Sequence, residues 1–290
     1  MELEFISISL FSSGSRPRRV LIVFAHPDKR SFNGALLQTA IHSLESKGCQ
    51  VEVSDLHQQN FDPRDNISDV KLDTDNDVAF NYSIESGKAY RSGKLSEERN
   101  AEIDKVKRAD LVVFQFPLYW SAAPAILKGW MDKVLIDGFA ADFEKGKILD
   151  KGLMKDKTAV LSITTGGSRA TLSSFGLFGD INVLLWPLQY GTLRMCGFNV
   201  LRPQLSCETL FVSEDKRKEY LASWESRLCS IFDEEPLSFP SVNEFDTKET
   251  WTLTEESREK YSKSGTIPSV VHHMGTLDVG QTFEIKKTGD

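Results

Sequence analysis

The feature that most constrains the fold of this 290-residue chain is a short apolar run that ends at a proline and leads through a loop into a helix. Residues 111–116, Leu-Val-Val-Phe-Gln-Phe, have the length and the β-branched and aromatic character of a parallel strand buried on both faces. Pro117 ends this strand because it has no N–H to donate to a strand ladder. Residues 118–120, Leu-Tyr-Trp, then lie in a loop at the strand's carboxyl end, and Pro124 opens a helix over residues 125–135.

Further strands alternate with helices along the chain. Apolar strands are predicted at residues 20–25, 51–56, 158–163 and 198–201. Helices are predicted at residues 34–47, near 83–90 in a polar stretch, at 96–108, within a mixed segment 175–190, and at 214–232. This alternation predicts an α/β fold with a doubly wound parallel sheet of five strands. Beyond Pro236 the sequence is polar and has no periodicity.

Composition excludes several classes of function. The net charge of −7 and the pI of about 5.4 argue against nucleic acid as the main partner, because binding phosphates needs a basic surface. No stretch approaches the roughly 20 apolar residues of a membrane span, so membrane insertion is not expected. The first residues are acidic, which indicates a tail rather than a signal peptide. The four cysteines are far apart, as in a cytosolic protein with reduced thiols, and do not suggest a metal site.

Three loops follow predicted strands and should meet at one edge of the sheet, where open α/β sheets bind ligands. The first loop, residues 26–33, leads into a helix N-terminus, whose free N–H groups and dipole attract phosphate. It is neither a P-loop nor a G-x-G-x-x-G motif. A nucleotide diphosphate would therefore be held by the backbone together with His26, Ser31 and Asn33.

The other two loops suggest a site for a flat ring. Tyr119 and Trp120 form an aromatic platform, and Gly166 and Gly167 let backbone N–H groups approach a ligand closely. Together with the phosphate loop, these features predict a flavin nucleotide. Each part alone has a plainer interpretation: the aromatic residues could be core residues, His26 a solvated histidine, and the glycine pair a common turn.

Longer motifs occur throughout residues 18–236. The chain contains V-L-I-V-F-A-H at 20–26, S-F-N-G at 31–34, A-D-L-V-V-F-Q-F-P-L-Y-W at 109–120, P-A-I-L-K-G-W-M-D-K-V-L at 124–135, L-S-I-T-T-G-G at 161–167, L-W-P-L-Q at 185–189 and C-G-F at 196–198. These runs resemble the NAD(P)H:quinone oxidoreductases, the family of DT-diaphorase and its ribosyldihydronicotinamide-using relative. Residues 271–275, Val-His-His-Met-Gly, resemble the C-terminal extension of DT-diaphorase, which the shorter relative lacks.

The resemblance implies a flavodoxin-like fold with strand order 2-1-3-4-5, an FAD cofactor and a homodimer with two sites at its interface. Hydride would pass from NAD(P)H to the flavin and then to a quinone, in ping-pong order. We expect residues 1–17 to be a disordered tail and residues 18–236 to be the FAD-binding domain. Residues 237–290 would be an extension that packs on this domain or on the partner subunit.

The site residues follow from the same resemblance, with two serines added. We expect the cofactor to contact His26, Ser31, Phe32, Asn33, Asn81, Leu118, Tyr119, Trp120, Ser121, Thr164, Thr165, Gly166, Gly167 and Arg217. We expect the substrates to contact Trp120, Ser121, Ala141, Asp142, Phe143, Gly166, Gly167, Leu172 and Phe178.

This chain departs from the family pattern mainly around the substrate. The resemblance implies a tyrosine and a histidine that stabilise the charge of the reduced flavin in the family. In this chain those two positions are Leu172 and Phe178. The phenylalanine that follows the family's tryptophan is replaced by Ser121. The family's aromatic gate residue is replaced by Ala141, and Phe143 lies two positions later. The metal-ligand positions of the shorter relative correspond to Tyr190, Arg194 and Phe239, so no such metal site is expected.

Two alternatives remain beside the FAD-dependent quinone reductase. The double loss at Leu172 and Phe178 raises the hypothesis of a weakened homologue that acts as a flavin-loaded binding or stabilising partner. A flavodoxin-type electron carrier is disfavoured because such carriers are shorter and usually bind FMN. The sequence leaves the nicotinamide donor and the quinone undetermined.

Overall fold

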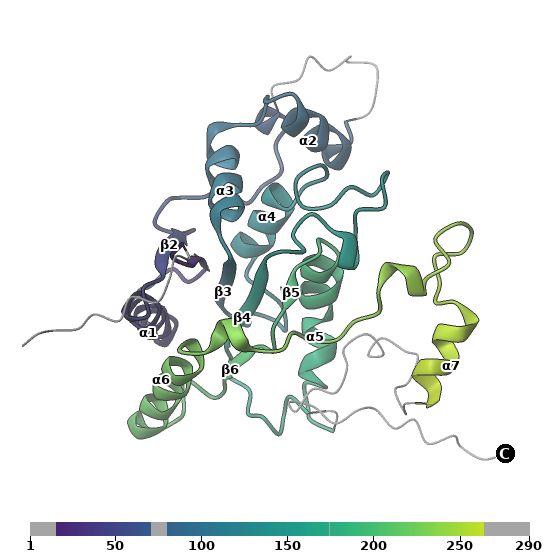
Figure 1. Cartoon of the computed structure of the whole chain (residues 1–290). Helices are drawn as coiled ribbons and strands as arrows, with labels where there is room; N and C mark the ends of the chain where they lie inside the picture. The colour runs from purple at the N-terminus through teal and green to yellow at the C-terminus, as the bar shows by residue number, and fades with distance from the viewer. Residues whose placement is uncertain (1–15, 71–79, 174, 264–290) are drawn as a thin grey trace, which may run out of the picture.

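A computed structural model describes residues 16–70, 80–173 and 175–263, so residues 271–275 and most of the N-terminal tail lie outside the described residues. A parallel sheet in the order β2-β1-β3-β4-β5 forms the centre, with β6 also paired to β4 (Figure 1). The strands are β1 (Arg19–Phe24), β2 (Gln50–Asp55), β3 (Leu111–Pro117), β4 (Thr158–Thr164), β5 (Asn199–Val200) and β6 (Gln204–Ser206). The predicted doubly wound fold and its strand order are confirmed.

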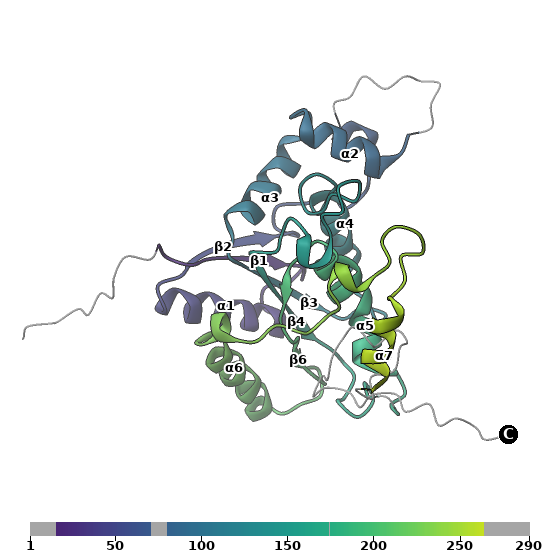
Figure 2. The ribbon, with the colours of Figure 1, turned by 45° about the vertical axis from the view of Figure 1, so that its right-hand side comes forward.

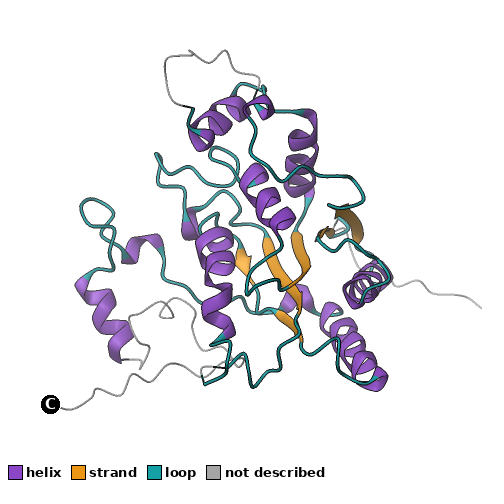
Figure 3. Cartoon of the chain, turned by 180° about the vertical axis from the view of Figure 1, so that it is seen from behind, coloured by secondary structure: helices purple, strands orange, loops and turns teal. Residues whose placement is uncertain are grey.

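Helices cover both faces of this sheet (Figures 2 and 3). One face packs against α1 (Phe32–Ser46) and α6 (Glu214–Leu228). The other packs against α3 (Glu97–Arg108), α4 (Ala125–Val134) and α5 (Ile181–Leu188). The remaining helices are α2 (Tyr82–Arg91), α7 (Glu255–Lys263), the π-helical η3 (Gln189–Arg194), and the 3₁₀ turns η1 (Ile67–Asp69), η2 (Leu149–Lys151), η4 (Ile231–Asp233) and η5 (Val242–Glu244).

Strand β3 lies between β1 and β4 and is buried along its whole length, as the sequence predicts. Successive side chains of a strand point to opposite faces. Val112 and Phe114 accordingly belong to the core on the α3–α4–α5 side, whereas Leu111 and Val113 belong to the core under α1 and α6. This double burial explains why the strand has no apolar–polar alternation.

Helix α1 begins two residues before the predicted start at Gly34, because Ser31 acts as its N-cap. The Ser31 Oγ accepts a hydrogen bond from the Gly34 N–H at 3.2 Å. Gly34 itself packs against the preceding loop, and an added Cβ would overlap the carbonyl group of Lys29. The cap and this contact fix how the loop enters the helix.

The fifth position of the sheet holds two short strands rather than the single strand that the sequence predicts. Strands β5 and β6 both pair with β4 and are separated by residues 201–203, which include Pro203. Proline cannot donate to the ladder, which accounts for the interruption. The second part, β6, brings residues 207–211 to the carboxyl edge of the sheet beside the end of β4.

The segment after Pro236 contains more regular structure than its composition suggests. Val242 packs against Ile148 and Leu149, and its N–H donates to Asp150 Oδ1 at 2.6 Å. Helix α7 was missed because its nine residues are almost all polar, so no apolar periodicity marks it. Its only local sign is a Thr254 hydroxyl that accepts from the Ser257 N–H, as a cap does.

Within the described parts of the chain, no helix is long and apolar enough to cross a membrane.

Replacing Gly34 with Ala should destabilise the fold by about 1–3 kcal/mol, because the new methyl group overlaps backbone that cannot move away. Urea unfolding of the apoprotein measures this. Gly191→Ala is the matched control, since its added Cβ would meet only the Trp186 carbonyl oxygen at 3.9 Å. Equal unfolding midpoints for the two variants would contradict the packing described here.

Candidate functional site

The three predicted loops do meet at the carboxyl edge of the sheet, where they enclose a cavity of about 570 Å³. We call it the strand-edge cavity. Its volume lies in the usual range for a small-molecule site. It is lined by His26, Arg30, Ser31, Phe32, Asn33, Pro117, Leu118, Tyr119, Thr164, Thr165, Gly166, Thr209, Leu210 and Arg217.

One part of this cavity suits phosphate. The first N–H groups of α1 have no acceptor within the helix and stand at its positive end. Arg217 of α6 donates to the Thr209 carbonyl oxygen at 2.9 Å, and its buried Nε has no hydrogen-bond partner among the described residues. Arg30, by contrast, is paired with Asp28 at 2.8 Å. The helix N-terminus and Arg217 are therefore the groups best placed to bind an anion.

His26 lies in the same cavity as a neutral group. Its Nδ1 accepts a hydrogen bond from the Asp28 N–H at 3.0 Å, so the proton of the neutral ring is on Nε2. Burial lowers the pKa of His26 below its usual range, although the nearby Asp28 raises it. At neutral pH this side chain can donate one hydrogen bond to a ligand.

A chain of buried amide and hydroxyl groups connects the loops from below. Gln115 Nε2 donates to Asn33 Oδ1 at 2.6 Å, and Asn33 Nδ2 donates to Thr164 Oγ1. The three residues are 1%, 3% and 5% exposed, respectively. A hydrogen bond is stronger in such an environment than in water, so this chain holds the ends of β3, β4 and helix α1 together.

The aromatic loop is a tight and strained turn. The Tyr119 N–H donates to the Ala122 carbonyl oxygen at 2.9 Å, and the reverse bond is 3.0 Å long. Trp120 and Ser121 between them have φ values of 47° and 59°, which glycine and asparagine adopt more readily. Each such residue costs roughly 1–2 kcal/mol. Strain of this kind is often found at ligand sites.

The two glycines differ in their surroundings. No atom lies within 4 Å of an added Cβ at Gly166, so this residue faces open space in the strand-edge cavity. At Gly167 an added Cβ would approach Thr171, Phe178 and Leu172 at 3.1–3.4 Å. Leu172 is 3% exposed and Phe178 is 49% exposed. Leu172 and Phe178, the two positions at which the resemblance predicts the loss of a tyrosine and a histidine, thus form an apolar support beside the glycine turn.

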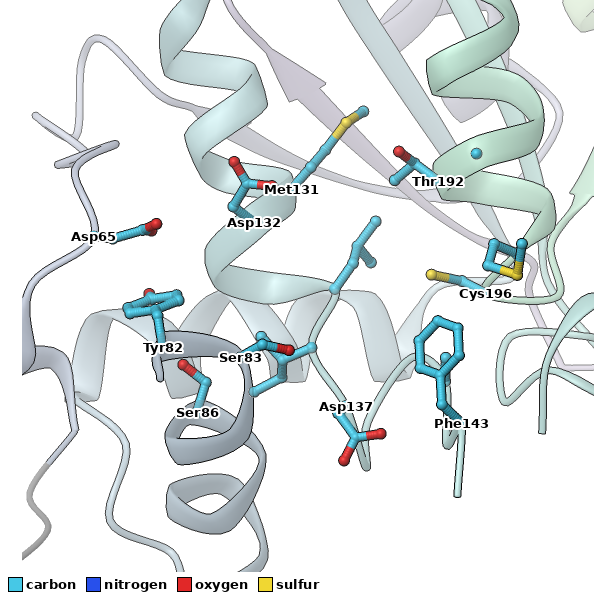
Figure 4. Close-up of a pocket in the computed structure, with 15 residues that line it drawn as sticks. Asp65, Tyr82, Ser83, Ser86, Met131, Asp132, Asp137, Phe143, Thr192 and Cys196 are labelled. Atoms are coloured by element: carbon cyan, nitrogen blue, oxygen red, sulfur yellow. The ribbon is translucent and has the colours of Figure 1, made fainter. Parts of the chain in front are cut away.

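Other predicted substrate residues line a different cavity. Ala141 and Phe143 border a space of about 410 Å³ between α2, α4, the loop after α4 and residues 191–196 (Figure 4). We call it the helix-side cavity, and it shares no lining residue with the strand-edge cavity. Asp142 is buried beside it. A hydrogen bond from the Lys145 N–H and the Lys145 ammonium group, 3.1 Å away, lower the pKa of Asp142.

Figure 4 shows how the helix-side cavity is built. Met131 comes from α4, Tyr82 and Ser86 from α2, and Phe143 from the loop on the opposite side. Burial raises the pKa of Tyr82 to about 12, so this phenol is neutral. The described lining residues include both apolar and polar side chains, but no arginine, lysine or histidine.

Some predicted cofactor residues do not border the strand-edge cavity. Asn81 caps α2, and its Oδ1 accepts from the Ile84 N–H at 3.2 Å. The Trp120 side chain is fully exposed. The cavity instead includes residues that the sequence did not suggest, namely Arg30, Pro117, Thr209 and Leu210. The last two follow β6, and only recognition of that strand could have placed them here.

The three positions for which the sequence analysis predicts the loss of metal ligands lie together. The rings of Tyr190 and Phe239 have centroids 5.6 Å apart, and the Arg194 guanidinium carbon lies 5.9 Å from the Phe239 ring centre. Trp186 stacks on Tyr190, with the two ring centroids 4.3 Å apart. An aromatic cluster therefore fills this region. Among the described residues, no group of three or more His, Cys, Asp or Glu side chains could hold a metal.

Comparison with known proteins agrees with the fold described above. A family model described as a flavodoxin-like fold matches residues 18–228. Ribosyldihydronicotinamide dehydrogenase [quinone] of Rattus norvegicus is 49% identical over 220 residues, which cover 76% of this chain and 94% of the relative. NAD(P)H dehydrogenase [quinone] 1 of Rattus norvegicus is 43% identical over 260 residues, which cover 89% of this chain and 94% of the relative. The chain belongs to the NAD(P)H:quinone oxidoreductase family.

A solved structure supports the same assignment. A Klebsiella pneumoniae protein assigned as a quinone reductase superposes with a TM-score of 0.78 at 30% identity, covering 89% of this chain and all of the other. The match to the longer rat relative covers 260 residues, whereas the match to the shorter one covers 220. This chain therefore shares more of its length with the longer type of family member.

Replacing Ser121 with Val should lower the free energy of unfolding by about 1–2 kcal/mol, because a β-branched side chain tolerates positive φ poorly. Ser121→Gly should unfold close to the parent or later, since glycine relieves the strain. Thermal unfolding of the two apoproteins measures the difference. A valine variant as stable as the glycine variant would mean that the turn does not have this conformation.

Proposed function

We propose that the protein reduces quinones by two electrons at the expense of NAD(P)H, with FAD bound in the strand-edge cavity. The observation that carries this proposal is the meeting of phosphate-binding groups, neutral hydrogen-bond donors and an aromatic wall in one cavity of a quinone oxidoreductase family member. When bound, a flavin supplies reversible hydride chemistry. One hydride from the donor and one proton from solvent convert the quinone to a hydroquinone.

The residues of the strand-edge cavity fit a flavin nucleotide. The α1 N-terminus and Arg217 can bind phosphate from two elements, which favours the pyrophosphate of FAD over the single phosphate of FMN. Phe32 and Tyr119 supply apolar surface, and the open side of Gly166 admits a ring edge. The Gly166 N–H can donate to a carbonyl oxygen of that ring, whereas the Gly167 N–H already donates to Thr165 Oγ1 at 3.1 Å.

A homodimer would complete the substrate site. The predicted substrate residues are divided between two cavities, with the glycine turn at one and Ala141 and Phe143 at the other. One chain therefore cannot enclose a substrate with all of them. We propose that the helix-side cavity of the partner subunit faces the strand-edge cavity, so that Phe143 of each subunit covers the other's substrate.

Donor and quinone would use this site in turn. Neither Leu172 nor Phe178 can donate a proton, so these two positions supply no proton donor for the reaction. A positioned proton donor contributes roughly 10²–10⁴-fold to a rate. We infer an altered and more apolar substrate pocket with a lower rate than a site that has the tyrosine and histidine.

The other features are consistent with this assignment. All four cysteines are free, and burial raises the pKa of Cys196 to about 12, so the buried thiol is unreactive. We place the protein in the cytosol, where thiols stay reduced and NAD(P)H is available. We expect no bound metal, no nucleic acid partner and no membrane insertion.

The second candidate is a weakened family member that binds FAD and serves as a binding or stabilising partner. The apolar pair Leu172 and Phe178 beside the glycine turn favours it, because both proton donors are lost together. The two candidates share the cofactor and differ in turnover.

Mixing the purified holoprotein with excess NADPH in a stopped-flow instrument should bleach the oxidised flavin, and menadione should then restore its absorbance. Ribosyldihydronicotinamide is tested in parallel as a donor without phosphates, and released cofactor is identified by mass spectrometry. A flavin that stays oxidised with every donor would reject the quinone reductase and leave the binding-partner candidate. Release of FMN alone would overturn the FAD assignment.

Introducing both lost side chains, by Leu172→Tyr with Phe178→His, should raise the rate of quinone reduction by about tenfold or more, because a proton donor returns to the site. FAD affinity should change little. Each single substitution serves as a control, and steady-state kinetics give the comparison. An unchanged rate in a stable double variant would show that these positions do not limit turnover in this pocket.

A further inference from the structure

A polar side chain that no comparison assigns to the site lies beneath the strand-edge cavity. Gln115 is the only polar residue in β3 and is 1% exposed. It does not line the cavity, but Asn33 and Thr164 do. The three side chains form two hydrogen bonds in series. Gln115 Nε2 donates to Asn33 Oδ1 at 2.6 Å, and Asn33 Nδ2 donates to Thr164 Oγ1. Three elements far apart in sequence are connected in this way.

The direction of these bonds determines what Thr164 can do. A carboxamide donates only through nitrogen and accepts only through oxygen. Because Gln115 donates to the Asn33 oxygen, Asn33 presents its nitrogen to Thr164, whose Oγ1 is then an acceptor. The Thr164 hydroxyl keeps its own hydrogen, for which the described residues offer no acceptor. That hydrogen is free for a ligand in the cavity.

We propose that Gln115 is a positioning residue that acts through Asn33 to hold the Thr164 hydroxyl as a hydrogen-bond donor to an oxygen or nitrogen acceptor of the flavin nucleotide. This inference rests on the proposed flavin site. It identifies one donor that remains although Leu172 and Phe178 have replaced the proton-donating pair. A donor oriented in advance stabilises negative charge without reorganisation when that charge develops.

The acceptor belongs either to the flavin ring or to its phosphates, and two measurements distinguish them. A donor to the ring interacts differently with oxidised and reduced flavin, so its loss shifts the reduction potential. A donor to phosphate affects both states equally, so its loss weakens FAD binding and leaves the potential unchanged.

The decisive variant is Gln115→Glu, which preserves shape and reverses polarity. An ionised glutamate only accepts hydrogen bonds, so the Asn33 amide must turn over and accept from the Thr164 hydroxyl. The donor is then withdrawn from the cavity. Thr164→Val removes the same donor directly at nearly constant volume. Each should weaken FAD binding to the apoprotein roughly tenfold, measured by quenching of FAD fluorescence.

The pH dependence separates this role from a merely structural one. When the carboxyl group introduced by Gln115→Glu is protonated, its O–H can donate to Asn33 as the native glutamine does. Burial raises the pKa of a carboxyl group. The Gln115→Glu variant should therefore bind FAD almost normally at low pH and lose affinity as pH rises through that pKa. Thr164→Val should be equally weak at each pH relative to the parent.

The matched controls keep the test interpretable. Thr164→Ser retains the hydroxyl and should bind as the parent does. Ser162→Ala removes another fully buried hydroxyl of β4 that has no partner among the described residues, and should leave affinity unchanged. Combining Gln115→Glu with Thr164→Val should cost no more at high pH than Thr164→Val alone, since both remove one donor.

The outcomes are distinct. Normal affinity and potential for both variants at every pH would overturn the positioning role, as would losses that simply add in the double variant. Both results would leave the proposed function intact if the parent binds FAD. A parent chain that binds neither FAD nor FMN would overturn the proposed function and this inference together.

Discussion

The candidate site depends on a single buried hydrogen-bonded chain that starts at Gln115 in the otherwise apolar strand β3. A buried amide without a partner is unfavourable by a few kcal/mol. The Gln115 Nε2 meets this constraint by donating to Asn33, which in turn donates to Thr164, whereas the buried Gln115 Oε1 has no hydrogen-bond partner among the described residues. The strand with the most apolar environment therefore also connects the start of α1 to the end of β4. The same bonds that stabilise the core orient groups in the cavity above it.

Around this fixed base, the residues that would meet a substrate are less constrained. The turn at Trp120 and Ser121 is strained and exposed, and Phe178 is half exposed beside the glycine pair. The complementary residues, Ala141 and Phe143, line a separate cavity. On the proposed function, one chain would bind the cofactor, whereas a substrate would be enclosed only between two copies. Leu172, Phe178 and Ala141 do not line the strand-edge cavity, so changes at these positions would leave its lining residues in place.

The predictions from the sequence agree best with the structure where local interactions determine the conformation. The alternation of apolar strands with helices predicted the parallel sheet, and the family motifs predicted its strand order. The helix predicted at residues 96–108 is α3, which begins at Glu97 with Ser96 as its N-cap. Departures occurred where local signals are weak. Helix α7 has no apolar face to reveal it, and the break at Pro203 divides the last strand. Thr209 and Leu210 were not predicted to line the cavity, because their position depends on β6, which lies after that break.

The amino-acid sequence alone is enough to predict the fold class, the family, the three strand-end loops and most of the residues that line the strand-edge cavity. These follow from hydrophobic periodicity, from caps and from motifs that are contiguous in the chain. The tertiary structure decided which side chains share a cavity and in which direction the buried hydrogen bonds run. Asn33 and Thr164 are 131 residues apart, and their contact exists only because β1 and β4 flank β3 in one sheet. Such contacts depend on packing between distant segments, which no local pattern of residues records.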